Sequence, residues 1–395
     1  MNIKKLLAVL LTIFIMAGMT ACGSTAPKTT PGNNPDYRVA MITDAGDITD
    51  QSFNQITYEA MSAYCKENKI DFTYKKPDGD TDYARIAMVD VAVAEGYNII
   101  IMPGFSFAAV LVETSYKYPD IKFIALDMTA GDIIAAAVGD IYYSDPDSYI
   151  ASDYYNTANT YCAVYQEELP GYMAGYTAVR LGYRKLGYLG GQAVPGVMRY
   201  GFGYLQGISD AAAELGVTDD VEVQYAYGGQ FYGSTEITAA MDTWFTKGTE
   251  IVFACGGGIF TSAAEAAAKE GGKIIGVDSD QSGIIDAYGK DMTVTSAMKE
   301  LGATVRAMLA AIIFDNTWSE HVGKIECLGL VSGTDMSLNY VGLPEDTTQW
   351  NDDFTVDDYH ELVRKMYDGE LKVVSSIDAP PSVSVKVNIR EGTIM

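Results

Sequence analysis

The first residues that could do chemistry are three aspartates in a short loop after an apolar run. Asp44, Asp47 and Asp50 fall within "RVAMITDAGDITDQSFNQ", and the aromatic Phe53 follows at once. Such carboxylates could bind a metal, act as a catalytic acid and base, or line a binding cleft. Their spacing misses the alternate-residue pattern of a calcium loop, and no suitable bidentate glutamate follows at its twelfth position. We therefore favour a cleft, with Asp50 capping the helix that begins near Gln51.

Other catalytic constellations have little support in the sequence. The two histidines, His321 and His360, stand in charged late segments away from any candidate nucleophile. The cysteines after Cys22 lie far apart and form no CxxC pair, which argues against zinc sites and nucleophilic triads. A glycosidase or nucleoside hydrolase with two carboxylates is the remaining enzyme alternative. We expect no enzyme activity, no metal and no cofactor.

An alternating pattern supplies the elements that would position these aspartates. Apolar, β-branched runs alternate with amphipathic segments such as Thr81–Glu95 and Ser234–Thr246, which predicts βα units and a parallel sheet. Strands are expected at "RVAMIT", "IDFTYKK", "NIIIMPG", "IKFIALD", "KLGYLGG", "VEVQYAY", "EIVFACGG" and "KIIGVD". Long helices are predicted over Thr295–Phe314 and around Val356–Tyr367. The tyrosine-rich segment Gly139–Thr160 breaks the alternation and is interpreted as a surface insertion near the cleft or the hinge.

An internal comparison indicates two similar halves. Residues 98–127 and 250–278 each contain an apolar strand, a glycine loop, a helix, a second apolar strand and a final aspartate. This predicts an α/β fold of two Rossmann-like lobes, each with a parallel sheet, joined by a multi-strand hinge. Open α/β sheets bind ligands at the carboxyl ends of their strands, and Asp44, Asp127 and Asp278 fall at such ends.

The two lobes are assigned by residue range. The first lobe is expected to contain residues 37–165 with about 293–322. The second lobe is expected to contain residues 166–292 with about 323–395.

The N-terminal region has the pattern of an exported lipoprotein. Lys4 and Lys5 precede an apolar run that is too short to span a bilayer, and the small residues Thr20 and Ala21 precede Cys22. We predict a signal peptide over residues 1–21, lipidation of Cys22 and a flexible tether over 22–36. The alternative is an ordinary signal peptide with a coincidental cysteine. The expected location is the extracytoplasmic face of the cell membrane.

Charge narrows the range of partners. The 395 residues carry a formal net charge of −25, and 48% of them are hydrophobic. A negative field of this size repels nucleic acid and phosphorylated ligands, so neither is an expected partner.

Five segments, in order, carry a family resemblance: "TDAGDITDQSFNQITYEAM", "YQEELPGYMAGYTA", "GGQFYG", "IIGVDSDQ" and "TSAMKELG". They resemble the basic membrane protein family of purine-nucleoside-binding lipoproteins, which serve ABC transporters and have the type I periplasmic-binding fold. The resemblance runs from about Arg38 to Gly342. It implies capture of guanosine, inosine or adenosine, delivery to the permease subunits of an ABC transporter, and a protein expected to be a monomer.

The resemblance also implies roles for first-lobe residues. Asp44 would end the first strand, and Phe53 would stack on one face of the base. Asn54 would supply a further hydrogen-bonding group. Asp127 would face the polar edge of the base.

In the second lobe, the resemblance implies an opposing aromatic and a ribose site. Phe231 would stack on the other face of the base, although Tyr232 beside it leaves the register open by one residue. Gly257, Asp278 and Lys299 would hold the ribose hydroxyls.

The chemistry of these side chains suits a neutral nucleoside. An aromatic ring stacks on a base, and a carboxylate accepts hydrogen bonds from hydroxyls and from a guanine-like edge. Sugar-binding sensors of the same architecture use the same groups, so a sugar or signal sensor is the alternative function within this fold.

Overall fold

The structure is a computed structural model that describes residues 36–44, 46–50 and 52–395. The expected signal peptide, Cys22 and nearly all of the tether lie outside these residues. Within the described ranges, no helix has the length and apolar character needed to cross a membrane.

The first sheet has six parallel strands in the order β11-β5-β4-β3-β1-β2. Every strand expected in this half of the chain is present. The strands are β1 (Arg38–Ile42), β2 (Asp71–Lys75), β3 (Ile99–Pro103), β4 (Lys122–Leu126), β5 (Thr160–Tyr165) and β11 (Ile325–Leu328). The core strands β3 and β4 are buried on both faces, which explains their continuous apolar sequences.

The second sheet has seven strands in the order β12-β10-β9-β8-β6-β7-β13, and only the β10–β12 pair is antiparallel. The strands are β6 (Lys185–Gly190), β7 (Glu222–Tyr227), β8 (Ile251–Cys255), β9 (Lys273–Asp278), β10 (Thr293–Lys299), β12 (Val341–Gly342) and β13 (Lys386–Thr393). The parallel sheets and βα alternation predicted from the sequence are therefore confirmed.

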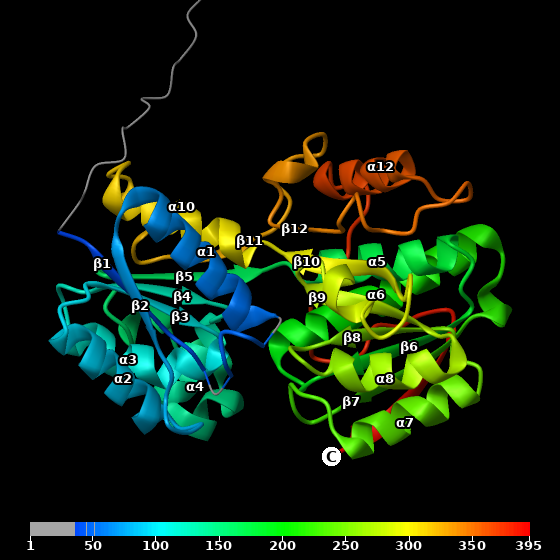
Figure 1. The fold of residues 1–395 in the computed structure, drawn as a ribbon, viewed down its shortest axis with the longest axis horizontal. Coiled ribbons are helices and arrows are strands. Elements are labelled where there is room, and N and C mark those ends of the chain that lie inside the picture. Colours follow the sequence, from blue (N-terminus) through cyan, green and yellow to red (C-terminus); the bar gives the residue numbers. More distant parts are fainter. Residues whose placement is uncertain (1–35, 45, 51) are drawn as a thin grey trace, which may run out of the picture. The chain divides into compact units, whose positions relative to one another are not determined.

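Helices cover both faces of each sheet (Figure 1). On the first sheet, α1 (Phe53–Asn68) and α10 (Leu301–Ile313) pack on one face, and α2 (Asp82–Ala94), α3 (Ala108–Lys117) and α4 (Ala130–Val138) pack on the other. On the second sheet, α5 (Glu168–Arg180) and α6 (Pro195–Leu215) face α7 (Thr235–Thr246) and α8 (Phe260–Glu270) across the strands. The shorter helices are α9 (Ser282–Ile285) and α11 (Trp318–His321), and α12 (Val356–Tyr367) lies beside α5.

The chain passes between the two sheets after β5, after β10 and after β11. These crossings are joined to one another through the backbone. The amide of Gln166 donates to the carbonyl of Leu328 at 2.9 Å, and the amide of Glu300 donates to that of Tyr340 at 2.9 Å. Together they form a multi-strand hinge.

Two details of the expected lobes are wrong. The sequence pattern places residues 293–299 in the first lobe and 295–299 in a helix, but they form β10 in the second sheet, where Met298 pairs with Asp278 of β9. Threonine and valine at 293–295 favour a strand, and the helix begins only at Leu301. Residues 325–328 are expected in the second lobe, but they pair with β5 in the first sheet.

The tyrosine-rich insertion consists mainly of 3-10 turns: η3 (Gly139–Ser144), η4 (Pro146–Ser148) and η5 (Ala151–Asp153). It connects the end of α4 to the start of β5. Tyr155 is buried and donates through its hydroxyl to the carbonyl of Gly323 at 3.0 Å. Tyr155 therefore holds the insertion at the amino end of β5, whereas Tyr142 reaches the start of α4, where a Cβ atom added to Gly131 would lie 3.0 Å from its hydroxyl oxygen. No residue of the insertion lines the cavity described below.

Candidate ligand-binding site

A cavity of about 560 Å³ lies where the carboxyl ends of the two sheets face each other. All eight residues proposed for ligand binding line it, although they come from seven separate segments of the chain. They are Asp44, Phe53, Asn54, Asp127, Phe231, Gly257, Asp278 and Lys299. A smaller hollow of about 330 Å³ lies by Lys185 and Glu222, at the amino ends of β6 and β7, where open α/β sheets do not bind their ligands.

The loop after β1 is organised by hydrogen bonds among its own polar side chains. Asp50 accepts from the amides of Asn54 at 2.9 Å and Gln55 at 3.0 Å, so its side chain caps the first turn of α1, although the helix begins at Phe53 and Ser52 occupies the N-cap position. Asp44 accepts from the Asn54 side-chain amide at 2.8 Å and from the Gly46 amide at 2.5 Å. Burial nevertheless raises the pKa of Asp44. Asn54 thus positions Asp44 and Asp50 rather than standing open to a ligand.

Asp47 has a different role from its neighbours. Its carboxylate forms an exposed ion pair with Lys76 at 2.7 Å, and this contact lowers its pKa. Asp47 does not line the cavity.

Two half-buried phenylalanines line the cavity from opposite lobes. Phe53 is the first residue of α1, and Phe231 lies in the loop after β7. The Phe231 ring packs directly against the backbone of two glycines. A Cβ atom added to Gly191 would lie 2.5 Å from ring carbon Cδ1, and one added to Gly256 would lie 3.0 Å from the same carbon, so a larger residue at either position would displace the ring. Tyr232 is 66% exposed, so Phe231 is the better candidate for stacking.

Asp127 and Asp278 occupy equivalent positions in the two halves. Asp127 directly follows β4, and Asp278 ends β9. Both adopt the left-handed backbone region, with φ of 55° and 65°. Residues other than glycine adopt this region at an energetic cost, and aspartate and asparagine tolerate it best. Both carboxylates lie beside the same cation, the Lys299 ammonium.

Lys299 joins the two halves. Its ammonium donates to Asp127 Oδ2 and lies 3.6 Å from Asp278 Oδ1 and 3.7 Å from Glu167 Oε1. We call these four residues the Lys299 cluster. Burial opposes the charged form of Lys299, but the three carboxylates outweigh that effect and raise its pKa. The Lys299 side chain is only 4% exposed.

This arrangement differs from the expected separation of Asp127 at the base edge from Asp278 and Lys299 at the ribose. The shared ammonium places Asp127 in the same polar cluster as Asp278. Asp127 Oδ1 is buried and has no hydrogen-bond partner in the described residues. Ser52 donates from its hydroxyl to Asp278 Oδ2 at 2.6 Å, which links the first lobe to the second.

Arg199 extends the cluster through Glu167, and neither of these two residues was among those expected from the sequence. Glu167 is fully buried at the first crossing between the sheets and accepts from Arg199 Nε at 2.6 Å. Arg199 lies in α6 and lines the cavity. Arg199 could have been predicted from the sequence, because the strand "KLGYLGG" was expected to end at the cleft and Arg199 lies in the first turns of the helix that follows it.

Glu168, next to Glu167, is a buried carboxylate of a different kind. Its Oε2 atom has no hydrogen-bond partner in the described residues, and burial raises its pKa to about 7. Glycines hold this region tightly, because a Cβ atom added to Gly203 of α6 would lie 2.1 Å from the Glu168 carbonyl oxygen. The side chain does not line the cavity.

The two sheets, the hinge and the cavity between their carboxyl ends define the type I periplasmic-binding-protein fold. Two solved structures share this architecture. A solute-binding protein of an ABC transporter system from Aeropyrum pernix K1 has a TM-score of 0.63 at 20% identity, covering 87% of this chain and 94% of that one. One from Conexibacter woesei DSM 14684 has a TM-score of 0.62 at 19% identity, covering 86% and 99%.

A family model described as "ABC transporter substrate-binding protein PnrA-like" (Bmp) matches residues 37–377, and the chain belongs to that family. It is 25% identical to the "ABC transporter nucleoside-binding protein BmpA" of Lactococcus lactis subsp. cremoris (strain MG1363), over 77% of this chain and 83% of that protein. It is also 25% identical to an uncharacterized lipoprotein of Pyrococcus abyssi (strain GE5 / Orsay), over 81% and 72%. The chain is therefore a substrate-binding component of an ABC transporter and not an enzyme, with a small-molecule ligand and a permease as its partners.

Proposed function

We propose that the protein captures purine nucleosides on the extracytoplasmic side of the membrane and delivers them to its ABC transporter permease. The observation that carries this proposal is the combination of Phe53 and Phe231 with the Lys299 cluster in one cavity. Two aromatic rings from opposite lobes suit the two faces of a flat base. Stacking contributes about 1–3 kcal/mol per base.

The polar groups divide between the two ends of such a ligand. Asp278 and Lys299, with the backbone of Gly257, suit the ribose hydroxyls, because a carboxylate accepts and an ammonium donates. The half-buried Asp44 is the acceptor for the donor-rich edge of a guanine or hypoxanthine base, since Asp127 belongs to the Lys299 cluster. The name of the Lactococcus relative, a nucleoside-binding protein, supports the same ligand class.

The decisive experiment is mass spectrometry of ligand released from denatured, purified protein, followed by titration calorimetry. We expect a purine nucleoside, with guanosine and inosine binding more tightly than pyrimidine nucleosides. A released sugar without a base, and no binding of nucleosides, would refute the proposal.

Two variants test the proposed orientation of the ligand. Asp278→Asn preserves a residue type that tolerates positive φ, so it tests the carboxylate rather than the turn. It should weaken guanosine by roughly tenfold to a hundredfold while changing guanine far less. Phe53→Ala should weaken both ligands. An unchanged guanosine-to-guanine ratio in Asp278→Asn would show that Asp278 does not hold the sugar.

We propose that Cys22 carries a lipid anchor, as in the relatives named as lipoproteins. Acyl chains would then hold the protein at the membrane surface. Changing Cys22 to Ser should move the protein from washed membranes to the soluble fraction. Retention on membranes after a high-salt wash would contradict this proposal. Size-exclusion chromatography with light scattering tests the proposed monomer.

A further inference from the structure

The cavity contains a second cation and carboxylate, on opposite lobes, that the ribose and base assignments do not use. We infer that Arg199 and Asp132 bind the 5′-hydroxyl of the nucleoside and are the residues that exclude 5′-phosphorylated ligands. This inference rests on the proposed function, because it names a further part of the same ligand.

Arg199 presents two unengaged groups to the cavity. Its Nε atom donates to the fully buried Glu167 at 2.6 Å, which fixes the side chain. Within the described residues, no hydrogen bond engages its terminal Nη1 and Nη2 atoms, and the side chain is 17% exposed. Glu167 also lies 3.7 Å from the Lys299 ammonium. Arg199 therefore adjoins the end of the cavity assigned to the sugar.

Asp132 provides the matching acceptor from the first lobe. One oxygen, Oδ2, accepts from the Thr129 amide at 2.8 Å and the Thr129 hydroxyl at 2.6 Å, which completes a capping box at the start of α4. No described residue donates to the other oxygen, Oδ1, and Asp132 lines the cavity. Arg199 lies close enough to influence the ionisation of Asp132, yet the two form no direct ion pair.

A hydroxyl group requires one acceptor for its proton and one donor for its lone pair. Asp278 with Lys299 offers such a pair, and Asp132 with Arg199 offers a second. A ribonucleoside has hydroxyls at two separate places on its sugar, the 2′,3′-diol and the 5′-hydroxymethyl group. We assign the Asp278–Lys299 pair to the diol and the Asp132–Arg199 pair to the 5′-hydroxyl.

A phosphate at the 5′ position is disfavoured at the same pair. The Arg199 Nη groups could donate to a phosphate there, but Glu167 already offsets the charge of Arg199, and Asp132 and Asp127 add two further negative charges that repel the phosphate. Rejection of nucleotides is therefore assigned to Asp132 rather than to the overall charge of the protein.

The test is titration calorimetry with inosine, 5′-deoxyinosine, 2′-deoxyinosine and inosine 5′-monophosphate. In the unmodified protein, loss of the 5′-hydroxyl should weaken binding roughly tenfold to a hundredfold. Arg199→Gln and Asp132→Asn should each reduce that penalty to about threefold or less and leave the 2′-deoxy penalty unchanged. Asp132→Asn should also narrow the gap between inosine and its monophosphate. The asparagine side chain of this variant can still accept the bond from the Thr129 amide, so Asp132→Asn tests the site even where Arg199→Gln fails to fold.

Asp278→Asn is the matched control, because it should reduce the 2′-deoxy penalty and preserve the 5′-deoxy penalty. A full 5′-deoxy penalty in both Arg199→Gln and Asp132→Asn would overturn the inference while leaving nucleoside binding intact. Failure of every nucleoside to bind the unmodified protein would instead refute the proposed function, and the inference with it.

Discussion

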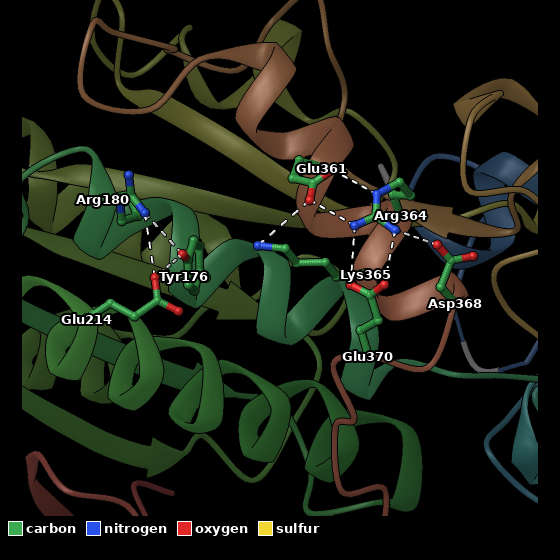
Figure 2. Close-up of polar contacts among 8 residues, drawn as sticks. All are labelled: Tyr176, Arg180, Glu214, Glu361, Arg364, Lys365, Asp368 and Glu370. Carbon is green, nitrogen blue, oxygen red and sulfur yellow. Dashed lines mark hydrogen bonds and ion pairs between the residues drawn. The ribbon is translucent and has the colours of Figure 1, made fainter.

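Two places in this molecule have the same charges and opposite surroundings. In the Lys299 cluster, one cation lies among Asp127, Glu167 and Asp278, and the lysine side chain is 4% exposed. In the second place, Arg364 of α12 pairs with Glu361 at 2.8 Å, Asp368 at 2.5 Å and Glu370 at 3.2 Å, and the arginine side chain is 35% exposed (Figure 2). We call this second group the Arg364 cluster.

The difference indicates that burial, rather than the number of ion pairs, determines how much a charged group contributes to the free energy of unfolding. Water screens the Arg364 cluster, and flexible side chains lose entropy when they pair, so exposed ion pairs contribute little. In the Lys299 cluster, the charged groups are largely removed from water, Asp127 being the most exposed at 19%, and they depend on their partners. Only the buried cluster holds groups ready for a ligand, and the predictions below test this contrast.

The largest effect is expected from removing the buried cation. Lys299→Met leaves three carboxylates in the interior with only Arg199 nearby, and breaking a buried ion pair costs about 3–5 kcal/mol. Urea denaturation should show this loss, and calorimetry should show no nucleoside binding. Lys269→Met is the matched control, since Lys269 pairs with Asp242 at 2.8 Å but is 54% exposed. Equal losses in the two variants would contradict the contrast.

Glu168, a buried carboxylate without an ion-pair partner among the described residues, should make the free energy of unfolding depend on pH. Burial raises the pKa of Glu168 from 4.5 to about 7, so between these values the folded state holds a proton that the unfolded state has released. Stability from this group is therefore present below about pH 4.5 and is lost as pH rises to about 7. The loss is on the order of 3 kcal/mol, at about 1.4 kcal/mol for each pKa unit.

The measurement is the free energy of unfolding from pH 4 to 8 for the unmodified protein and for Glu168→Gln. The difference between the two curves should fall across this range. Glu370→Gln, which changes an exposed carboxylate of the Arg364 cluster, serves as the control. A flat curve for Glu168→Gln would show that water reaches the Glu168 carboxylate.

The sequence predicted the framework of the buried cluster better than its contents. Asp127 and Asp278 could be found because apolar strands end at each of them, and strand ends of parallel sheets form the ligand-binding edge. Family resemblance places Lys299 in the site, whereas the pattern alone predicts helix for its strand, because "TVTSAM" runs directly into the apolar pattern of α10. The periodicity of apolar residues does not show where the strand β10 ends and the helix α10 begins.

Contacts between residues that lie far apart in the chain could not be predicted from the sequence. Glu167 and Arg199 are 32 positions apart, and they meet because glycines let α5 and α6 approach closely. Gly207 is one of them, since an added Cβ atom would lie 2.1 Å from the Tyr172 carbonyl oxygen. The sequence showed the glycines but not which carbonyl each would face. The partner of β7 at the C-terminus, β13, was missed because its sequence is polar and mostly exposed.

A smaller effect is expected from the hydroxyl that completes the buried cluster. Ser52 donates to Asp278 at 2.6 Å, and a hydrogen bond to a buried charged group contributes about 1.5–3 kcal/mol. Ser52→Ala should lower the free energy of unfolding by that amount. Ser337→Ala is the matched control, because the Ser337 hydroxyl donates to exposed Asp335 at the same distance of 2.6 Å. Equal effects would mean that burial does not strengthen the contact.

The smallest effect is expected in the Arg364 cluster itself. Arg364→Gln removes a cation from three carboxylates, as Lys299→Met does, but the partners remain hydrated: their side chains are 50%, 43% and 56% exposed. Water replaces the lost contacts, and salt screens the remaining repulsion between carboxylates. We therefore expect no resolvable change in urea denaturation at about 0.15 M salt or in nucleoside affinity, and only a slight loss of stability at low salt. A loss at physiological salt approaching that of Lys299→Met would mean that the number of ion pairs, and not burial, determines what such a cluster contributes.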